Sequence, residues 1–185
     1  MARLRVPVTE RDHQRGSTRA SVTLVEYGDY QCPFCGRAFW VLRDIEDRFR
    51  NDLRFVYRHF PLTEIHPLAL IAAEAAELAG DQGRFWDMHD TLFQNQPAFQ
   101  PEELAGYAGE LGLDVDAFSE DLVSLRHRDG IREDFMGGVR SGVNGTPSLF
   151  INGELFDGPA EMIPLARAIE TARGRWQAGV RSVAP

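Results

Sequence analysis

The order of hydrophobic and polar positions predicts a strand, a helix and a second strand in the first third of the chain. β-branched and aromatic residues fill Ser21–Tyr27 and Leu53–Phe60, as is typical of strands, and Pro61 ends the second run. Between them, apolar residues recur at helical spacing over Cys32–Arg50. The three segments predict a β-α-β unit with a right-handed crossover.

The middle of the chain shows helical periodicity, punctuated by glycine and proline. The expected helices cover residues 66–78, 84–93, 101–111, 116–125 and 131–140. Strand character returns over 147–152, and Asn152-Gly153 predicts a tight hairpin with a returning strand through Leu155-Phe156. An amphipathic helix over 161–177 closes the pattern. The whole pattern predicts an α/β chain, with a β-α-β unit first, a helical block next and a β-β-α unit last.

Composition adds limits to this picture. A chain of 185 residues suits one domain with a sizeable core. We divide it into an extended N-terminal arm over 1–20, one domain over 21–178 with a helical insertion at about 62–143, and a C-terminal tail over 179–185. All 20 basic residues are Arg, so mechanisms that need a lysine in this chain, such as Schiff-base and P-loop chemistry, are excluded.

The net charge of −8 argues against nucleic acid as a partner, because phosphate binding needs a basic field. The first 20 residues are locally basic, with five Arg against Glu10 and Asp12. No apolar run matches a signal peptide or the roughly 20 residues of a membrane span. We therefore expect a cytoplasmic protein without a membrane span, although a mature exported form would read the same way.

The candidate chemistry lies in Cys32-Pro33-Phe34-Cys35, which follows a strand and opens a helix. Positions i and i+3 share a helix face, which places the two cysteines within disulfide range. Pro33 suits the first helical position. The helix N-terminus would stabilise a Cys32 thiolate, and pKa values of roughly 3.5–7.5 are found in such settings. Cys32 is then the nucleophile and Cys35 the resolving thiol.

Two other interpretations of the pair stay open. The cysteines could be inert packing residues or a structural disulfide, although a bridge that closes so short a loop stabilises little. Two subunits could also pool four thiolates around zinc or a cluster. We expect no metal and no cofactor within a single chain.

Two further positions bear on this chemistry. Glu26 shares a strand face with Val22 and Leu24, so we expect it to be at least partly buried; a carboxyl with a raised pKa could take the proton of Cys35. An exposed strand glutamate is the alternative. Thr146-Pro147 follows Gly145 and begins a buried strand, so whether the Thr146–Pro147 peptide bond is cis or trans bears on the site.

With these residues the chain resembles the DsbA-like thioredoxin-fold thiol–disulfide oxidoreductases, in particular the branch also found fused to sodium/proton antiporters. The resemblance rests on the Cys32–Cys35 motif after VEYGDY, on Gly145-Thr146-Pro147, and on RHFPL, His66-Pro67 and the FW-x-MH segment at 85–89. It implies a thioredoxin fold with a helical insertion. It also implies a cis Pro147, a Thr146 backbone that pairs with an extended substrate, and a buried acid at Glu26.

One residue departs from the strongly oxidising members, which carry Pro-His between the cysteines. Phe34 offers neither a donor nor a charge, so we expect a potential of roughly −150 to −250 mV, between those of thioredoxin and DsbA. Tyr30 and Phe34 flank the cysteines, and either could form an apolar docking surface or serve in packing.

The expected function is an enzyme that exchanges disulfides with protein or small thiol substrates and is recycled by a redox partner. The alternative is a redox-sensing module whose disulfide toggles the binding of a protein partner.

Overall fold

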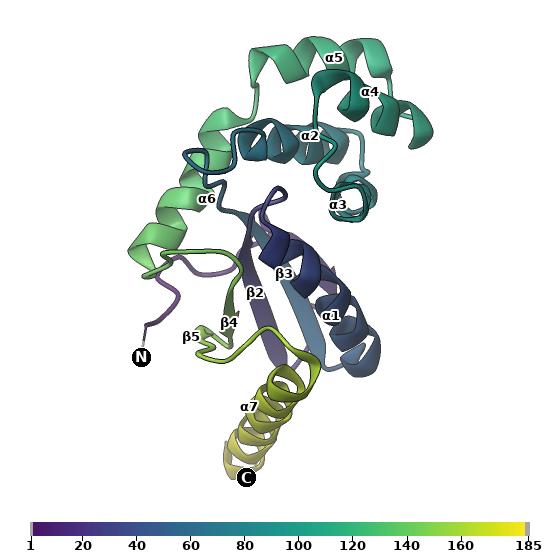
Figure 1. Cartoon of the computed structure of the whole chain (residues 1–185). Coiled ribbons are helices and arrows are strands. Elements are labelled where there is room, and N and C mark those ends of the chain that lie inside the picture. The colour runs from purple at the N-terminus through teal and green to yellow at the C-terminus, as the bar shows by residue number, and fades with distance from the viewer. Residues whose placement is uncertain (1, 184–185) are drawn as a thin grey trace. The chain divides into compact units, whose positions relative to one another are not determined.

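The computed structural model describes residues 2–183 and contains a mixed five-stranded sheet with the order β1-β3-β2-β4-β5 (Figure 1). The strands are β1 (His13–Gly16), β2 (Val22–Gly28), β3 (Leu53–His59), β4 (Ser148–Ile151) and β5 (Glu154–Leu155). The helices are α1 (Pro33–Phe49), α2 (Ala69–Asp81), α3 (Phe85–Gln94), α4 (Pro101–Glu110), α5 (Val115–Ser124), α6 (Arg128–Arg140) and α7 (Met162–Val183). This α/β thioredoxin fold confirms the predicted fold class.

The chain forms two compact units. The first, which we call the sheet unit, comprises the residues up to Tyr27, Arg37–Arg58 and the residues from Gly137 onward. The second, the helical unit, comprises Gly28–Gly36 and His59–Met136.

In the sheet unit, nearly every residue of β2 and β3 is buried, so both faces of these strands are covered, and polar residues such as Glu26 and Arg58 are buried along with the apolar ones. Strand β4 pairs antiparallel with β2, with Ile151 opposite Leu24 and Ser148 opposite Tyr27. The β4–β5 hairpin turns at Asn152 and Gly153, whose φ angles of 48° and 81° suit a two-residue hairpin turn. The hairpin predicted from these two residues is confirmed.

Strand β1 was not predicted and lies inside the expected extended arm. His13–Gly16 pairs antiparallel with β3, with His13 opposite Tyr57. The sequence HQRG lacks apolar alternation because β1 is an edge strand whose Arg15 makes an ion pair with Glu46 at 3.0 Å. At the other end α7 continues to Val183, beyond the predicted end at 177, and residues 184–185 lie outside the described part. The division into arm, domain and tail stays a prediction.

A buried arginine holds the N-terminal segment to the sheet. Arg58, 3% exposed, donates from Nε to Oδ1 of Asp12 at 2.6 Å and from Nη1 to the Tyr27 hydroxyl at 3.0 Å. Its guanidinium also donates to the backbone carbonyls of Val6 and Pro7. Burial acts to lower the pKa of Arg58, but the hydrogen bonds to Asp12 and Tyr27 outweigh it and raise the pKa above its usual value.

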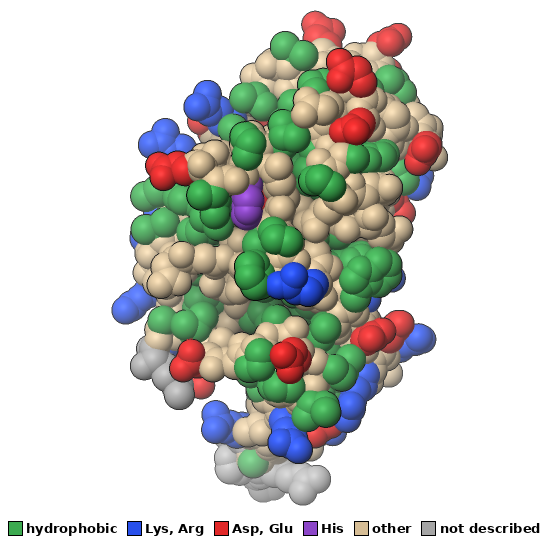
Figure 2. Space-filling view, viewed as in Figure 1, with side chains coloured by type: hydrophobic (Ala, Val, Ile, Leu, Met, Phe, Trp, Pro, Cys, Tyr) green, Lys and Arg blue, Asp and Glu red, His purple; other side chains and the backbone are tan. Residues whose placement is uncertain are grey.

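In the helical unit, α2 packs against α3, α4 and α5 (Figure 1). Its small alanines allow close approach, and most of its residues are buried. Residues 101–124, which include α4 and α5, carry seven acidic and no basic side chains, and acidic groups gather over these helices in Figure 2. Within residues 2–183, no helix has both the length and the apolar character that a membrane span requires.

Candidate active site

The dithiol motif lies at the start of α1. Cys32 comes directly before Pro33, the first helical residue, and Cys35 lies in the first turn, which confirms the predicted placement at a helix N-terminus. The Cys32 N–H donates to the carbonyl of Asp29 and the Gly36 N–H donates to the carbonyl of Cys32, both at 3.1 Å. Cys32 and Cys35 are buried, whereas Phe34 between them is 61% exposed. The motif therefore presents an aromatic ring beside a shielded thiol.

The loop before the motif is held by the carboxylate of Asp29, which is 2% exposed. Its Oδ1 accepts from the Gln31 N–H at 2.8 Å. Its Oδ2 accepts from the Leu62 N–H at 2.9 Å and lies 2.8 Å from Nδ1 of His66. The backbone carbonyl of Asp29 accepts from the Cys32 N–H, and the side chain of Asp29 contacts Leu62 and His66. Asp29 therefore connects the motif to the segment that precedes α2.

Two glutamine side chains form further hydrogen bonds within the helical unit. Oε1 of Gln31 accepts from the Leu68 N–H at 2.7 Å. Nε2 of Gln96, in the loop after α3, donates to the carbonyls of Tyr30 and Cys32. Three of these residues were not predicted as individual site residues: Asp29, His66 and Gln96. Asp29 and His66 stood in the segments that carried the family resemblance, whereas nothing in the sequence pattern marks Gln96.

Tyr30 belongs to a buried aromatic cluster, which favours packing over docking, the two roles considered for it. It is 1% exposed, its ring lies 4.9 Å from that of Phe93 between centroids, and its hydroxyl hydrogen-bonds Nδ1 of His89 at 3.0 Å. Burial of both the ring and a satisfied hydroxyl is the usual solution for a core tyrosine. Of the two flanking aromatics, Phe34 is the exposed one.

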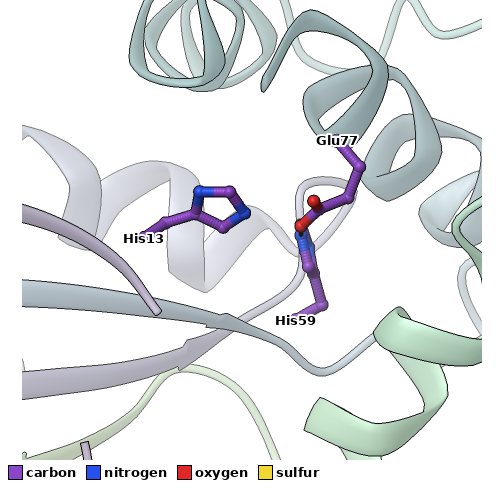
Figure 3. A group of neighbouring side chains, drawn as sticks. All are labelled: His13, His59 and Glu77. Atoms are coloured by element: carbon purple, nitrogen blue, oxygen red, sulfur yellow. Dashed lines mark hydrogen bonds and ion pairs between the residues drawn. The ribbon is translucent and has the colours of Figure 1, made fainter. Parts of the chain in front are cut away.

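A histidine and a carboxylate meet where β3 ends. Nε2 of His59 lies 2.8 Å from Oε1 of Glu77, which reaches toward it from α2 (Figure 3). The backbone N–H of His59 donates to Oδ2 of Asp134 in α6 at 3.0 Å. These contacts fix the chain as it enters the helical unit.

A second carboxyl of α2 is buried more deeply. Glu74 is fully buried, and its Oε1 accepts from the His127 N–H at 2.6 Å. Burial raises the pKa of Glu74 and outweighs the opposing effect of that hydrogen bond. Glu74 is thus an internal acid of the helical unit.

The remaining predicted positions lie in the sheet unit. Glu26 is 2% exposed on β2, as the alternation predicted, and stands opposite Leu149 of β4. The Thr146–Pro147 peptide bond, directly before β4, is cis, and the Ser148 hydroxyl donates to the carbonyl of Gly145 at 2.7 Å. The roles assigned to Glu26, Thr146 and Pro147 stay predictions.

A family model described as thioredoxin matches residues 8–171. The chain belongs to the thioredoxin family. This thioredoxin-family chain is 48% identical over 170 residues to a Na(+)/H(+) antiporter NhaA 1 of Salinispora arenicola; the match covers 91% of the chain but only 26% of the antiporter. The chain therefore spans about a quarter of the length of that relative.

Solved structures share the fold of this chain. Oxidised BdbD from Bacillus subtilis matches with a TM-score of 0.84 and 23% identity, over 94% of this chain and 98% of BdbD. A thioredoxin-like oxidoreductase from Silicibacter pomeroyi matches with a TM-score of 0.79 and 29% identity, over 90% and 94% of the two chains. The predicted thioredoxin fold and the predicted relation to the branch found with sodium/proton antiporters are confirmed.

Proposed function

We propose that this chain is a thiol–disulfide oxidoreductase that exchanges disulfides through Cys32 and Cys35. The observation that carries the proposal is the position of Cys32 directly before α1, with Cys35 in the first helical turn. A helix N-terminus stabilises a thiolate, which is the nucleophile of disulfide exchange. The likeness to the Silicibacter pomeroyi oxidoreductase, at 29% identity, supports the same class of reaction.

In the reducing direction, the Cys32 thiolate attacks one sulfur of a substrate disulfide. The substrate S–S bond breaks, a mixed disulfide forms and the other substrate sulfur leaves as a thiolate. Cys35 then loses its proton and attacks the Cys32 sulfur, which releases the second substrate thiolate and leaves a Cys32–Cys35 disulfide. The substrate gains two electrons and the dithiol loses two; the oxidising direction is the reverse.

The other predicted residues have supporting roles in this proposal. Glu26 accepts the proton of Cys35, and the backbone at Thr146-Pro147 pairs with an extended substrate segment. The exposed Phe34 gives an apolar contact beside Cys32. We propose protein or small thiol substrates, a redox partner that recycles the dithiol, and a cytoplasmic location.

A trapping experiment tests the reaction. Cys35→Ser leaves the nucleophile but removes the resolving thiol, so we expect mixed disulfides that survive non-reducing electrophoresis and collapse with dithiothreitol. Cys32→Ser is the matched control and should trap nothing. Wild-type protein should also reduce insulin or oxidise reduced ribonuclease. Absence of both trapping and exchange would contradict the proposal; a complex with a protein partner that depends on the redox state would then favour the sensing module.

A further inference from the structure

The carboxamide of Gln96 contacts the backbone of the redox motif directly. Gln96 is the second residue after α3, far from the motif in sequence, and its side chain is half-buried. Its Nε2 donates to the carbonyl of Tyr30 and, at 3.1 Å, to the carbonyl of Cys32. One NH₂ group has two donors, so both are used on this one loop.

Gly36 provides the space that this carboxamide occupies. A Cβ atom at Gly36 would lie 2.1 Å from Oε1 and 2.9 Å from Cδ of Gln96. Such distances are shorter than van der Waals contact, so any side chain at this position would displace the Gln96 carboxamide. The absence of a side chain at Gly36 therefore allows the Gln96 carboxamide to reach the motif.

We propose that Gln96 is a positioning residue for disulfide exchange, which holds the Tyr30 and Cys32 carbonyls so that the Cys32 sulfur stays at the N-terminus of α1. The Cys32 carbonyl accepts both from Gln96 and from the Gly36 N–H, which is the first hydrogen bond of the helix. Fixing this carbonyl fixes the backbone of Cys32, and with it the direction of the Cys32 side chain relative to the helix N–H groups. Without the amide, the loop relaxes and the thiolate loses part of this stabilisation.

Substitutions at Gln96 separate hydrogen bonding from packing. Gln96→Met keeps the length and volume of the side chain but has no donor. Gln96→Glu keeps the shape but faces the two carbonyls with a carboxylate. Gln94→Ala is the matched control, since Gln94 is an exposed glutamine two residues away.

The readout is the pKa of Cys32, followed by thiolate absorbance and by the rate of alkylation against pH. Loss of hydrogen bonds of ordinary strength should lower the ratio of thiolate to thiol at Cys32, compared with the wild type at the same pH, roughly threefold to tenfold in Gln96→Met. Gln96→Glu should lower it further, and Gln94→Ala should match the wild type. A thiolate-to-thiol ratio in Gln96→Met within twofold of the wild-type ratio at the same pH would overturn the proposal.

Gly36→Ala provides an independent test in which Gln96 itself is retained. The new methyl group pushes the carboxamide away, so Gly36→Ala should raise the pKa of Cys32 much as Gln96→Met does. In a Gln96→Ala background the space is open, so adding Gly36→Ala should change the pKa little further. Such non-additivity is the mark of a direct contact. Additive effects, or no effect of Gly36→Ala, would contradict the arrangement even if a Gln96 variant failed to fold.

The role assigned to Gln96 in exchange rests on the proposed function, but the two can fail separately. The pKa of Cys32 is measured without a substrate. A raised pKa in Gln96→Met, together with no trapping by Cys35→Ser, would support the positioning and refute the exchange activity. Normal trapping and exchange with an unchanged pKa would refute the positioning alone.

Discussion

Nδ1 of His66 lies 2.8 Å from Oδ2 of Asp29, and the same oxygen accepts from the Leu62 N–H at 2.9 Å. The carboxylate of Asp29 thus joins the loop before the dithiol to the segment before α2. Both contacts belong to the helical unit, and neither residue carries the exchange chemistry. The dithiol motif and the residues that hold its loop thus lie in the same helical unit, which is more than an insertion in the sequence.

Asp29→Ala should destabilise this loop. It removes the acceptor of two backbone N–H groups and of His66, and buried donors without an acceptor cost about 2–4 kcal/mol of unfolding free energy together. Chemical denaturation would measure the loss. Asp87→Ala is the control, because Asp87 is 51% exposed and pairs with Arg84 at the surface; its effect should stay below about 0.5 kcal/mol. Equal effects of the two substitutions would argue against the bridging role.

Removing the guanidinium of Arg58 should be more damaging than removing an exposed one. The side chains of Arg58 and Asp12 are 3% and 8% exposed, so Arg58→Met leaves a buried carboxylate without its cation. A loss of about 3–5 kcal/mol is expected from such a broken pair. Arg50→Met provides the comparison, since Arg50 and Asp47 are 76% and 74% exposed and should contribute under about 1 kcal/mol. A small effect at Arg58 would show that the N-terminal segment is held by other contacts.

Glu74 should make stability depend on pH. Burial raises its pKa in the folded state, so the folded protein keeps this proton to a higher pH than the unfolded chain does. Its contribution is therefore full below the unfolded pKa of about 4.3 and is lost as the pH rises through the raised folded pKa. Glu74→Gln should gain stability relative to the wild type as the pH rises above about 4.3. Urea denaturation at several pH values would measure the difference.

The control for Glu74 is Glu120→Gln, because Glu120 is exposed on α5. Its stability should stay within about 0.5 kcal/mol of the wild type across the same range. A difference between Glu74→Gln and the wild type that is constant with pH, or that falls as the pH rises, would contradict the assignment of Glu74 as an internal acid.

Phe34→His should make the dithiol more oxidising. An imidazole beside Cys32 can donate to the thiolate or carry a positive charge, and either lowers the pKa of Cys32 and stabilises the reduced form. The equilibrium constant against glutathione should shift by about tenfold, which corresponds to about 30 mV upward. Phe34 is 61% exposed, so the Phe34→His substitution should leave the free energy of unfolding nearly unchanged. Phe34→Leu is the apolar control and should keep the wild-type potential.

The sequence patterns predicted most elements because each of them carries a local signal. The apolar spacing over Cys32–Arg50 and the β-branched and aromatic residues of Ser21–Tyr27 predicted elements that correspond to α1 and β2 within two residues. Strand β1 was missed because an edge strand with the sequence HQRG has no buried face to impose alternation. The end of α7 was set six residues early, at 177 rather than Val183.

The site divides in the same way. Cys32, Cys35 and the burial of Glu26 follow from spacing and alternation, which are local. The contacts of Asp29 with His66 and of Gln96 with Cys32 join residues 37 and 64 positions apart. No periodicity marks such pairs, because one hydrogen bond fixes only one position in each segment. The sequence left docking and packing both open for Tyr30 for a related reason: only the packing of His89 and Phe93 around it shows that its ring is internal.

The N-terminal segment is held largely through its main chain. Arg58 binds the carbonyls of Val6 and Pro7, the Leu4 N–H donates to the carbonyl of Gly153, and the Leu155 N–H donates to the carbonyl of Ala2. Main-chain groups are the same in every residue type, apart from the N–H that proline lacks. Side chains over residues 2–7 can therefore vary widely among homologues while the segment keeps its attachment, whereas Arg58 and Asp12 should vary together.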